Sequence, residues 1–464
     1  MSITNQKFKM NPTQIIIMGF LIIVLAGALL LMLPISSTSR EMTPFIDCLF
    51  TSTSAVCVTG LTTVNTAVHW SLFGKMVIIA LIQIGGLGFM SILTVFMMIF
   101  GKQITLSERI LIQESLNLAT FKGIVVFVKK IIIATLLVEI IGTIVLSFRF
   151  IPKYGFVSGL FKSFFHSISA FCNAGFDVLG ASSLCSYYDD PLVSLTIMTL
   201  IVFGGLGFSV WIELFECVSD LRKKVVPANL ILRRLSLHTK LVLIITAVLI
   251  IFGCGFFFIA EYSNANTIGN FSIPEKLLAS LFQSVTLRTA GFFTIDQYTL
   301  TPSSKLISVV LMAIGGSPGG TAGGMKTTTF GVIIVSIITI IRGNERIFLF
   351  NRRISFNTLL RSLVIVMLII ILLLSGCIIL SFTEVELSGR FEFLDILYEV
   401  TSALSTTGLS VGISPLLTTT GKFVLSALMF IGRLGPFTIA LALTRKVDKN
   451  NSSMNFPEGK VLVG

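Results

Sequence analysis

The sequence predicts an all-α polytopic membrane protein in which four similar units surround one central axis, and three observations lead to this prediction. Only 12% of the 464 residues are charged and 54% are hydrophobic, whereas soluble domains are typically ~25% charged. Four short segments that end in glycine recur at nearly constant spacing, with an apolar stretch on each side of every segment. Lysine and arginine are concentrated in the stretches that join one unit to the next.

The first apolar run, Ile15 to Leu33, predicts a membrane helix at the start of the first unit. It is long enough to cross a hydrocarbon core of ~30 Å at about 1.5 Å per residue. A cleaved signal peptide is the alternative, but its apolar region usually spans only ~7–15 residues. We therefore expect this helix to stay in the mature chain.

The internal repeat is carried by four segments that end in an anchor glycine. They read TSTSAVCVTGL (51–61), HSISAFCNAGF (166–176), FQSVTLRTAGF (282–292) and EVTSALSTTGL (399–409). The anchors Gly60, Gly175, Gly291 and Gly408 are 115, 116 and 117 residues apart. Six residues before the glycine stands Ser54, Ser169 or Ser402, whereas the third segment has Val285. A second signature (GGLGF, GGLGF, GGSPGG, GRLGP) follows 24 to 29 residues after each anchor, so the chain is a fourfold repeat.

Each unit has one apolar span before its anchor and one after it. The first spans are 15–33, 124–148, 241–260 and 359–382, and the second are about 72–100, 191–215, 305–341 and 422–444. The stretch between them, such as 161–171, is too short to cross a bilayer and predicts a re-entrant half-helix. Because non-helical backbone at membrane depth must be covered by protein or water, we expect eight spanning helices and four half-helices around one central ion pore.

These spans divide the chain into four units and a cytoplasmic tail. The units are 15–100, 101–217, 218–343 and 344–446, and the tail is 447–464. The N-terminus and the between-unit segments hold 20 lysines and arginines, against 7 in the segments around the anchors. By the positive-inside rule both termini lie in the cytoplasm and the half-helices enter from outside.

The anchors predict a cation filter, because rings of backbone carbonyls can replace the hydration shell of an ion and glycine permits the dihedral angles required. The ion-binding residues expected are Cys57, Val58, Thr59, Gly60, Cys172, Asn173, Ala174, Gly175, Arg288, Thr289, Ala290, Gly291, Ser405, Thr406, Thr407 and Gly408. Only one of these is cationic, Arg288, and we expect it to point away from the axis toward Glu399. Tight turns in a transporter of another solute are the alternative interpretation.

The span 305–341 contains the glycine-rich stretch GGSPGGTAGGMKTTT at 315–329. The stretch is not a phosphate-binding loop, because Met325 separates the last glycine from Lys326. Glycine and proline are the poorest helix formers, so the helix should break here, and a break at this depth must line a cavity. For Lys326 we consider two roles, snorkelling to the inner interface and gating.

Arg433 lies at a similar distance from its own anchor as Gly315 does. An intramembrane cation should face the bundle interior or water, and in a cation path it would also raise the barrier by repulsion. A purely structural arginine, paired with a carboxylate or with loop carbonyls, is the alternative. Nothing predicts an enzyme or a transition-metal site, since the seven cysteines and three histidines are scattered without ligand spacing.

Several motifs together resemble the Ktr/Trk/HKT superfamily of potassium transporters, most of all the bacterial KtrB-type membrane subunit. They are LLLMLPIS (29–36), LIQIGGLGF (81–89), SISAFCNAGFD (167–177), LSLHTKL (235–241), TLRTAGF (286–292) and MFIGRLGP (429–436). The resemblance implies potassium uptake across the bacterial plasma membrane through a four-unit pore, often with sodium stimulation. It also implies a homodimer controlled by a cytosolic RCK-type nucleotide-binding ring like KtrA or KtrC. We expect this chain itself to bind neither nucleotide nor nucleic acid.

The same resemblance implies that an intramembrane loop under the filter gates the pore. The gate residues expected are Gly315, Gly316, Ser317, Pro318, Gly319, Gly320, Thr321, Ala322, Gly323, Gly324, Lys326 and Arg433. Cys57 and Cys172 depart from the family where a hydroxyl residue is expected, which leaves the ion preference open if side chains matter. Two alternatives remain: a sodium-preferring uniporter of the same family, which Gly60 opposes, and a secondary transporter of an organic solute, which would normally show two large repeats.

Overall fold

The computed structural model describes residues 12–99, 105–115, 123–180, 182–223, 234–344, 346–350, 352–384 and 391–443. Within that part nearly all regular structure is helical, which confirms the predicted all-α class. The two strands found there, β1 (Phe348–Leu349) and β2 (Arg352–Arg353), form a small antiparallel hairpin. The predicted tail 447–464 lies outside the described residues.

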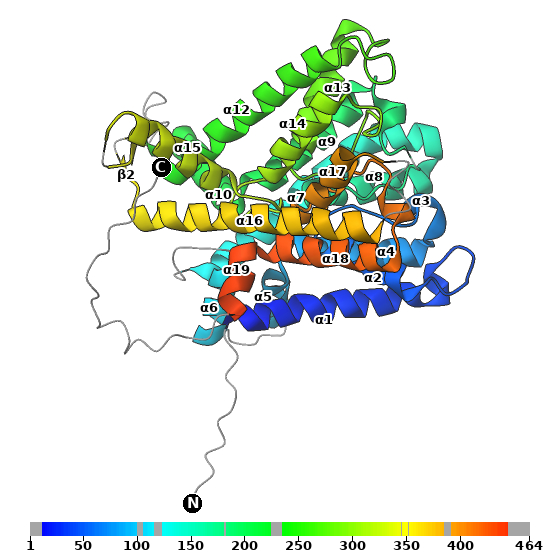
Figure 1. Ribbon diagram of the computed structural model, residues 1–464. Helices are drawn as coiled ribbons and strands as arrows, with labels where there is room; N and C mark the ends of the chain where they lie inside the picture. The colour runs from blue at the N-terminus through cyan, green and yellow to red at the C-terminus, as the bar shows by residue number, and fades with distance from the viewer. Residues whose placement is uncertain are drawn as a thin grey trace, which may run out of the picture.

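Four long helices are apolar enough to cross a membrane. They are α1 (Pro12–Met32), α7 (Ile124–Tyr154), α12 (Leu237–Ala260) and α16 (Phe356–Thr383). Large apolar side chains stand exposed along them, as with Ile251 at 71% and Phe382 at 79%. An exposed apolar surface of this kind suits contact with lipid. Figure 1 shows α1 and α16 running along the length of the molecule.

A shorter helix packs against each long one. These helices are α2 (Phe45–Val56), α8 (Phe156–Phe171), α13 (Ile273–Thr286) and α17 (Phe393–Leu404). At three of the four contacts a serine hydroxyl of the short helix donates to a carbonyl of the long helix. The pairs are Ser52 to Val24 at 2.7 Å, Ser167 to Glu139 at 2.6 Å and Ser284 to Ile250 at 2.8 Å. Glycines Gly27, Gly142 and Gly253 make room for these serines, so the three contacts are built alike.

The helix that follows each anchor is interrupted in all four units, not only in the third. The pairs are α4 (Leu72–Leu87) with α5 (Phe89–Ile99), α9 (Pro191–Leu206) with α10 (Phe208–Arg222), α14 (Pro302–Ala313) with α15 (Thr327–Ile341), and α18 (Thr419–Leu434) with α19 (Pro436–Leu443). Gly88, Gly207 and Gly435 have φ of 79°, 92° and 88°, which ends an α-helix. The sequence predicted a break only in the third unit, so the interruptions in the other three are a finding of the structure; α9 and α10 meet at 101°.

By length and composition, four described helices could cross a membrane, or five if α9 and α10 form one bent span. The arrangement of eight spans stays a prediction. The smaller elements are η1 (Pro34–Ser36), α3 (Thr66–His69), α6 (Leu106–Ser115), η2 (Cys185–Tyr187) and η5 (Ser414–Leu416).

The helices after the anchors all begin with a side-chain cap. The capping residues are Ser71, Asp190, Thr301 and Thr418, each of which accepts a bond from a backbone N–H two or three residues on. Glu261 and Glu384, at the ends of α12 and α16, accept further bonds from Thr301 and Thr418. Caps of this kind satisfy N–H groups that a helix leaves unpaired, so the N-terminal ends of these helices are fixed in position.

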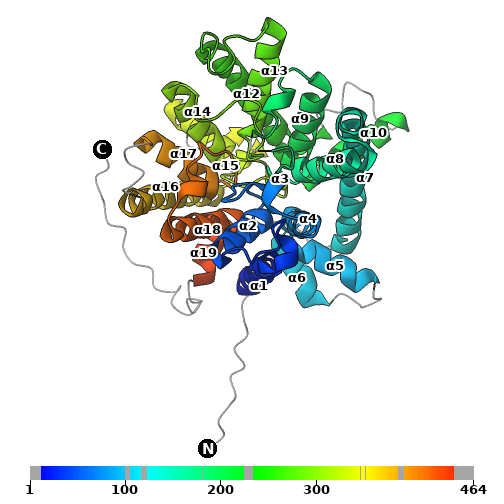
Figure 2. The same cartoon turned by 90° about the vertical axis from the view of Figure 1, so that its right-hand side faces the viewer.

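Seen end-on, the helices follow one another around a common centre. Figure 2 shows α1, α2 and α4 in blue, then α7 to α9, α12 to α14, and α16 to α18 in turn. Two ion pairs join successive groups: Lys305 Nζ lies 2.7 Å from Asp395 Oδ1, and Lys422 Nζ lies 2.7 Å from Asp47 Oδ1. The short helices thus lead four separate stretches of chain to the same place.

Candidate functional site

The four anchor segments have the same backbone conformation where they leave the short helices. Two residues before each glycine stands a left-handed residue: Val58, Asn173, Thr289 or Thr406, with φ between 52° and 66°. The anchors Gly60, Gly175, Gly291 and Gly408 also have positive φ, of 102°, 67°, 84° and 88°. A left-handed non-glycine residue costs about 1–2 kcal/mol. Four such residues at equivalent positions therefore indicate a functional site, where the surrounding structure stabilises a strained backbone.

The four anchor glycines meet at the centre of the molecule. A Cβ on each of them would contact a carbonyl oxygen from another unit: on Gly60 at 2.5 Å from Ala174, on Gly175 at 2.8 Å from Ala290, on Gly291 at 2.7 Å from Thr407, and on Gly408 at 1.9 Å from Thr59. The contacts run from the first unit to the second, third and fourth and back to the first. The structure therefore brings the predicted glycines into one closed ring, which we call the carbonyl ring, and only glycine fits there.

Hydroxyl side chains of the short helices support the ring from behind. Gly60 and Gly408 donate their N–H groups to Ser54 Oγ and Ser402 Oγ, each at 3.0 Å. Ser169 instead donates to the Phe176 carbonyl at 2.7 Å.

In the third unit the residue that takes this place is Thr286, which donates to the Phe292 carbonyl. Alignment on the glycine had placed Val285 there, but this segment has one residue fewer between the supporting hydroxyl residue and the anchor. The Ala290 N–H bonds to the carbonyl four residues back, whereas the Ala174 N–H bonds five back. In the sequence, the signal for this difference is the hydroxyl residue Thr286, one position after Val285.

The expected pairing of Arg288 with Glu399 is wrong. Glu399 is satisfied within its own segment, where it accepts bonds from Ser410 and Ser414 and from the Val411 N–H. Arg288 instead donates from Nη2 to the Gly315 carbonyl at 3.3 Å. Its guanidinium group is buried, at 7% exposure, and lies against the glycine-rich loop.

The glycine-rich loop, residues 314–326, lies against the bases of the anchor segments. Its Gly323 N–H donates to Thr289 Oγ1 at 3.1 Å, and Thr321 Oγ1 donates to the Phe171 carbonyl at 3.1 Å. The loop N–H groups of Ser317 and Thr321 donate to the carbonyls of Gly205 and Gly204 at 2.9 and 3.1 Å. The break in the third unit is thus an ordered loop held by its own unit and by the second.

Comparison with known proteins agrees with this architecture. The sequence pattern of the TrkH family of cation transport proteins matches residues 3–454 of this chain. The chain belongs to the TrkH family. It is 41% identical over 456 residues to Ktr system potassium uptake protein B of Bacillus subtilis (strain 168), covering 98% of this chain and 97% of that protein. It is 39% identical over 457 residues to the potassium/sodium uptake protein NtpJ of Enterococcus hirae, covering 98% of each.

A solved structure has the same fold. The potassium transporter TrkH from Vibrio parahaemolyticus superposes with a TM-score of 0.71 at 17% identity, over 95% of this chain and 86% of the other. The relatives are named as transport proteins and not as enzymes, as the sequence predicts.

Arg433 of this TrkH-family chain reaches across the space under the carbonyl ring. Its Nη1 donates to the Thr321 carbonyl of the glycine-rich loop, and its Nη2 donates to the carbonyls of Gly85 and Gly86 in α4. Within the described part of the chain no carboxylate forms an ion pair with it. Its charge is therefore held by carbonyl dipoles alone.

The side chain of Lys326 finds its partner within the glycine-rich loop. Its Nζ turns back to the loop and donates to the Ala322 carbonyl at 2.7 Å. Because Lys326 also precedes the first residue of α15, Thr327, its backbone fixes where that helix begins. The loop thus carries a cation at its end, in addition to the guanidinium group of Arg433.

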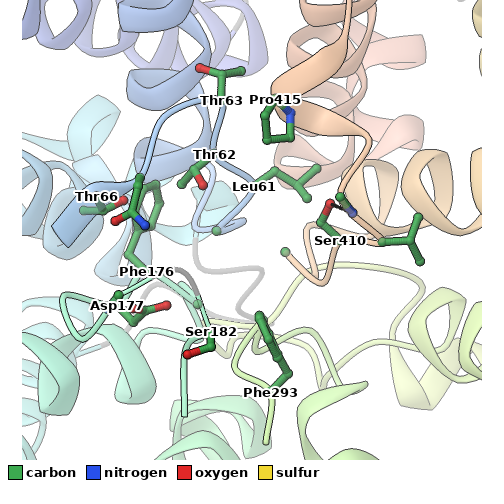
Figure 3. Close-up of a pocket in the computed structure, with 18 of the residues that line it drawn as sticks. Leu61, Thr62, Thr63, Thr66, Phe176, Asp177, Ser182, Phe293, Ser410 and Pro415 are labelled. Carbon is green, nitrogen blue, oxygen red and sulfur yellow. Dashed lines mark hydrogen bonds between the residues drawn. The ribbon is translucent and has the colours of Figure 1, made fainter. Parts of the chain in front are cut away.

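A cavity of about 760 Å³ opens on the far side of the ring from the loop. The four anchor glycines line it, together with polar residues of the loops that follow the anchors, such as Thr63, Asp177, Ser182 and Ser410. Figure 3 shows these side chains around the space, from segments far apart in sequence. Water and ions that fill this cavity would reach the carbonyl ring directly.

Proposed function

We propose that this chain takes up potassium through the carbonyl ring, which acts as a selectivity filter. The observation that carries the proposal is the closed circuit of four glycines, each in contact with the carbonyl oxygen that precedes the next anchor. Rings of carbonyl oxygens replace the hydration shell of potassium. The membrane potential supplies the driving force, about 2.3 kcal/mol per elementary charge per 100 mV.

The names of relatives support potassium as the ion. The Bacillus subtilis relative is named a potassium uptake protein and the Enterococcus hirae relative a potassium/sodium uptake protein. Sodium is therefore the second candidate ion, as a co-stimulating or a competing cation. Gly60 in the first segment favours potassium within the resemblance described above.

We further propose that the glycine-rich loop is the gate. Its contacts with Thr289 and the Phe171 carbonyl place it against the base of the filter. Arg433 and Lys326 add positive charge on the loop side, and in a site of low dielectric this charge repels a cation. Opening requires the loop to release Arg433 and the carbonyls of α9 that it now contacts.

The remaining parts of the proposal concern topology and assembly. We propose eight spans in four units, with both termini in the cytoplasm, and a homodimer controlled by a cytosolic RCK-type nucleotide-binding ring. The Ktr system named for the Bacillus subtilis relative supports a multi-component assembly. The hairpin β1–β2 offers cytoplasmic surface for such a partner under this topology.

Uptake by the purified protein in potassium-free proteoliposomes tests the function. With an inside-negative potential, external potassium should enter with saturation, and excess sodium should compete weakly. Equal uptake of sodium and potassium would favour the sodium-preferring alternative. No cation flux in vesicles that contain folded protein, with or without the regulatory ring, would contradict the proposal.

A further inference from the structure

Three polar side chains meet inside the protein where the first unit contacts the second. Gln83 in α4 donates from Nε2 to Glu139 Oε2 in α7 at 3.2 Å. The thiol of Cys172, at the base of the second filter segment, donates to Gln83 Oε1 at 3.5 Å. Glu139, Gln83 and Cys172 therefore form one hydrogen-bonded chain, which we call the polar chain, from a long helix to the filter.

Among the residues that the structure describes, the equivalent positions of the other units carry no such chain. Glu139 is the residue whose carbonyl accepts the bond from Ser167, and the same place in the first and third units is taken by Val24 and Ile250. Gln83 stands two residues before Gly85, which packs on the last carbonyl of α2. The positions equivalent to Gln83 are Val202 in α9, Ala313 in α14 and Phe430 in α18. The polar chain is thus a departure from the repeat.

Glu139 is an unusual residue to bury at this depth. Its side chain is only 4% exposed, its Oε1 has no partner, and it forms no ion pair with any cation of the described chain. Acidic groups inside membrane helices are costly and mark function more often than structure. An apolar residue, as in the other units, would fill the position without that cost.

Glu139 fixes which way the Gln83 amide faces. The Glu139 oxygen that faces Gln83 accepts from the NH₂ end of its amide, so the amide oxygen is left to face the Cys172 thiol. On its other side Cys172 packs against Gly86, where a Cβ would lie 2.6 Å from Sγ. The side chain of Cys172 is therefore held between Gly86 and Gln83.

The position of the Cys172 side chain affects the filter segment, because Cys172 directly precedes the left-handed residue Asn173. A rotation at Cys172 would turn the carbonyls that lead to Gly175. We propose that Glu139 and Gln83 are positioning residues, which set the second filter segment through Cys172 and so adjust ion discrimination in one quarter of the ring. This inference rests on the proposed filter function.

Four variants test it: Glu139→Leu, Glu139→Gln, Gln83→Leu, and the matched control Ile250→Leu at the equivalent position of the third unit. Each is purified, checked for folding by size exclusion, and assayed in proteoliposomes for the KM of potassium, for Vmax and for inhibition by sodium. Glu139→Leu and Gln83→Leu should each raise the KM by about fivefold, as for one net hydrogen bond, and strengthen sodium inhibition. Vmax should stay within about twofold.

The Glu139→Gln variant distinguishes a positioning role of Glu139 from an effect of its negative charge. Glu139→Gln keeps an oxygen that accepts from Gln83, so it should restore the parent KM, and Ile250→Leu should not change it. The double variant Glu139→Leu/Gln83→Leu should be no worse than either single one, since both break the same chain. If Glu139→Gln is as impaired as Glu139→Leu, the negative charge acts and positioning is overturned.

An unchanged KM in folded Gln83→Leu would also overturn the proposal, even if Glu139→Leu fails to fold. Gly175→Ser, measured in parallel, separates the two levels of inference. A changed potassium KM in Gly175→Ser with no change in Gln83→Leu rejects the positioning role and leaves the filter. No change in either variant rejects the filter itself.

Discussion

The carbonyl ring is built alike in all four units, whereas the layer directly beneath it differs between units. In the ring all four units contribute the same glycine with the same sign of φ. In the layer below, three units place a glycine where the fourth has an arginine: Gly86, Gly205 and Gly316 against Arg433. The third unit also inserts the loop 314–326, where the first, second and fourth units turn at a single glycine.

This difference separates what the repeat must preserve from what it need not. An ion on the axis can be surrounded evenly only if every unit supplies equivalent oxygens, so a change in one unit would distort the whole ring. A gate needs only one obstruction, and a single loop with one opposing cation is sufficient. Under the proposed function, symmetry is kept where four equal ligands are needed and lost where one gate is enough.

Among the changes that test this difference between the two layers, deleting residues 317–323 should have the largest effect on potassium uptake. The loop closes on itself, since the Gly316 N–H bonds to the Gly323 carbonyl at 3.3 Å and Ile314 pairs with Met325, so the cut ends already lie close together. The deletion removes several loop contacts worth about 1 kcal/mol each and should raise potassium uptake by at least ~10-fold in proteoliposomes. Selectivity should not change, and unchanged flux would remove the loop from the gate.

Arg433→Gln should have the next largest effect. It removes charge-assisted bonds to the Thr321, Gly85 and Gly86 carbonyls, each worth about 1.5–3 kcal/mol. Potassium uptake should rise about fivefold or more. The matched control is Arg342→Gln at the exposed end of α15, which should leave uptake unchanged. A fall in uptake with intact folding would mean that Arg433 supports the open pore instead.

The sequence predicted the ring better than the layer beneath it, and the reason is physical. Gly60 and its three counterparts are visible because the same backbone demand recurs four times. Arg288 and Glu399 were paired wrongly because each finds its partner elsewhere: Arg288 donates to the Gly315 carbonyl, and Glu399 accepts bonds within its own segment.

The bends at Gly88, Gly207 and Gly435 were missed because a single glycine in an apolar run is compatible with a continuous helix. At Gly207 the positive φ goes with a tertiary contact: a Cβ there would lie 2.5 Å from the Pro318 carbonyl of the glycine-rich loop. Contacts of this kind, between residues more than a hundred positions apart, are not encoded in local pattern.

The ion pairs between units offer a smaller test, at the outer edge of the fourfold arrangement. Lys422 and Lys75 both stand four residues after the cap of their helix, but Lys422 pairs with Asp47 whereas Lys75 donates to the Ala67 carbonyl. Lys422→Met leaves a largely buried carboxylate and should cost about 1–2 kcal/mol. We expect Tm in detergent to fall by roughly 2–6 °C.

Lys75→Met is the matched control for that substitution. It removes a bond to a neutral carbonyl and leaves no unpaired charge, so Tm should fall by less than in Lys422→Met. Equal losses in the two variants would show that the unit contacts are equivalent despite their different partners.

The smallest effect should come from pH acting on the outer cavity. Burial raises the pKa of Asp177 from 3.8 to about 6, against the opposing effect of N–H bonds from Leu179 and Gly180. Above pH 6 the carboxylate is charged and attracts cations, so the KM for potassium should rise by about twofold as pH falls from 7.5 to 5. Asp177→Asn should remove this pH dependence, and its persistence would exclude Asp177 as the source.

The same shift has a consequence for stability with a definite sign. Because the pKa of Asp177 is raised in the folded state, the folded protein holds this proton more tightly than the unfolded chain does. The stabilising contribution of Asp177 is therefore complete below about pH 4 and is lost as pH rises through 6. Asp177→Asn should flatten this part of the stability profile.

Potassium uptake by cells that lack their own uptake systems, with each anchor glycine changed in turn to serine, tests the central claim most directly. A serine Cβ at Gly60, Gly175, Gly291 or Gly408 meets a carbonyl oxygen of another unit at 2.8 Å or less. All four variants should therefore lose potassium affinity by about 10-fold or admit sodium, with the greatest loss at Gly408. Loss at one position and normal uptake at the other three would contradict a shared ring.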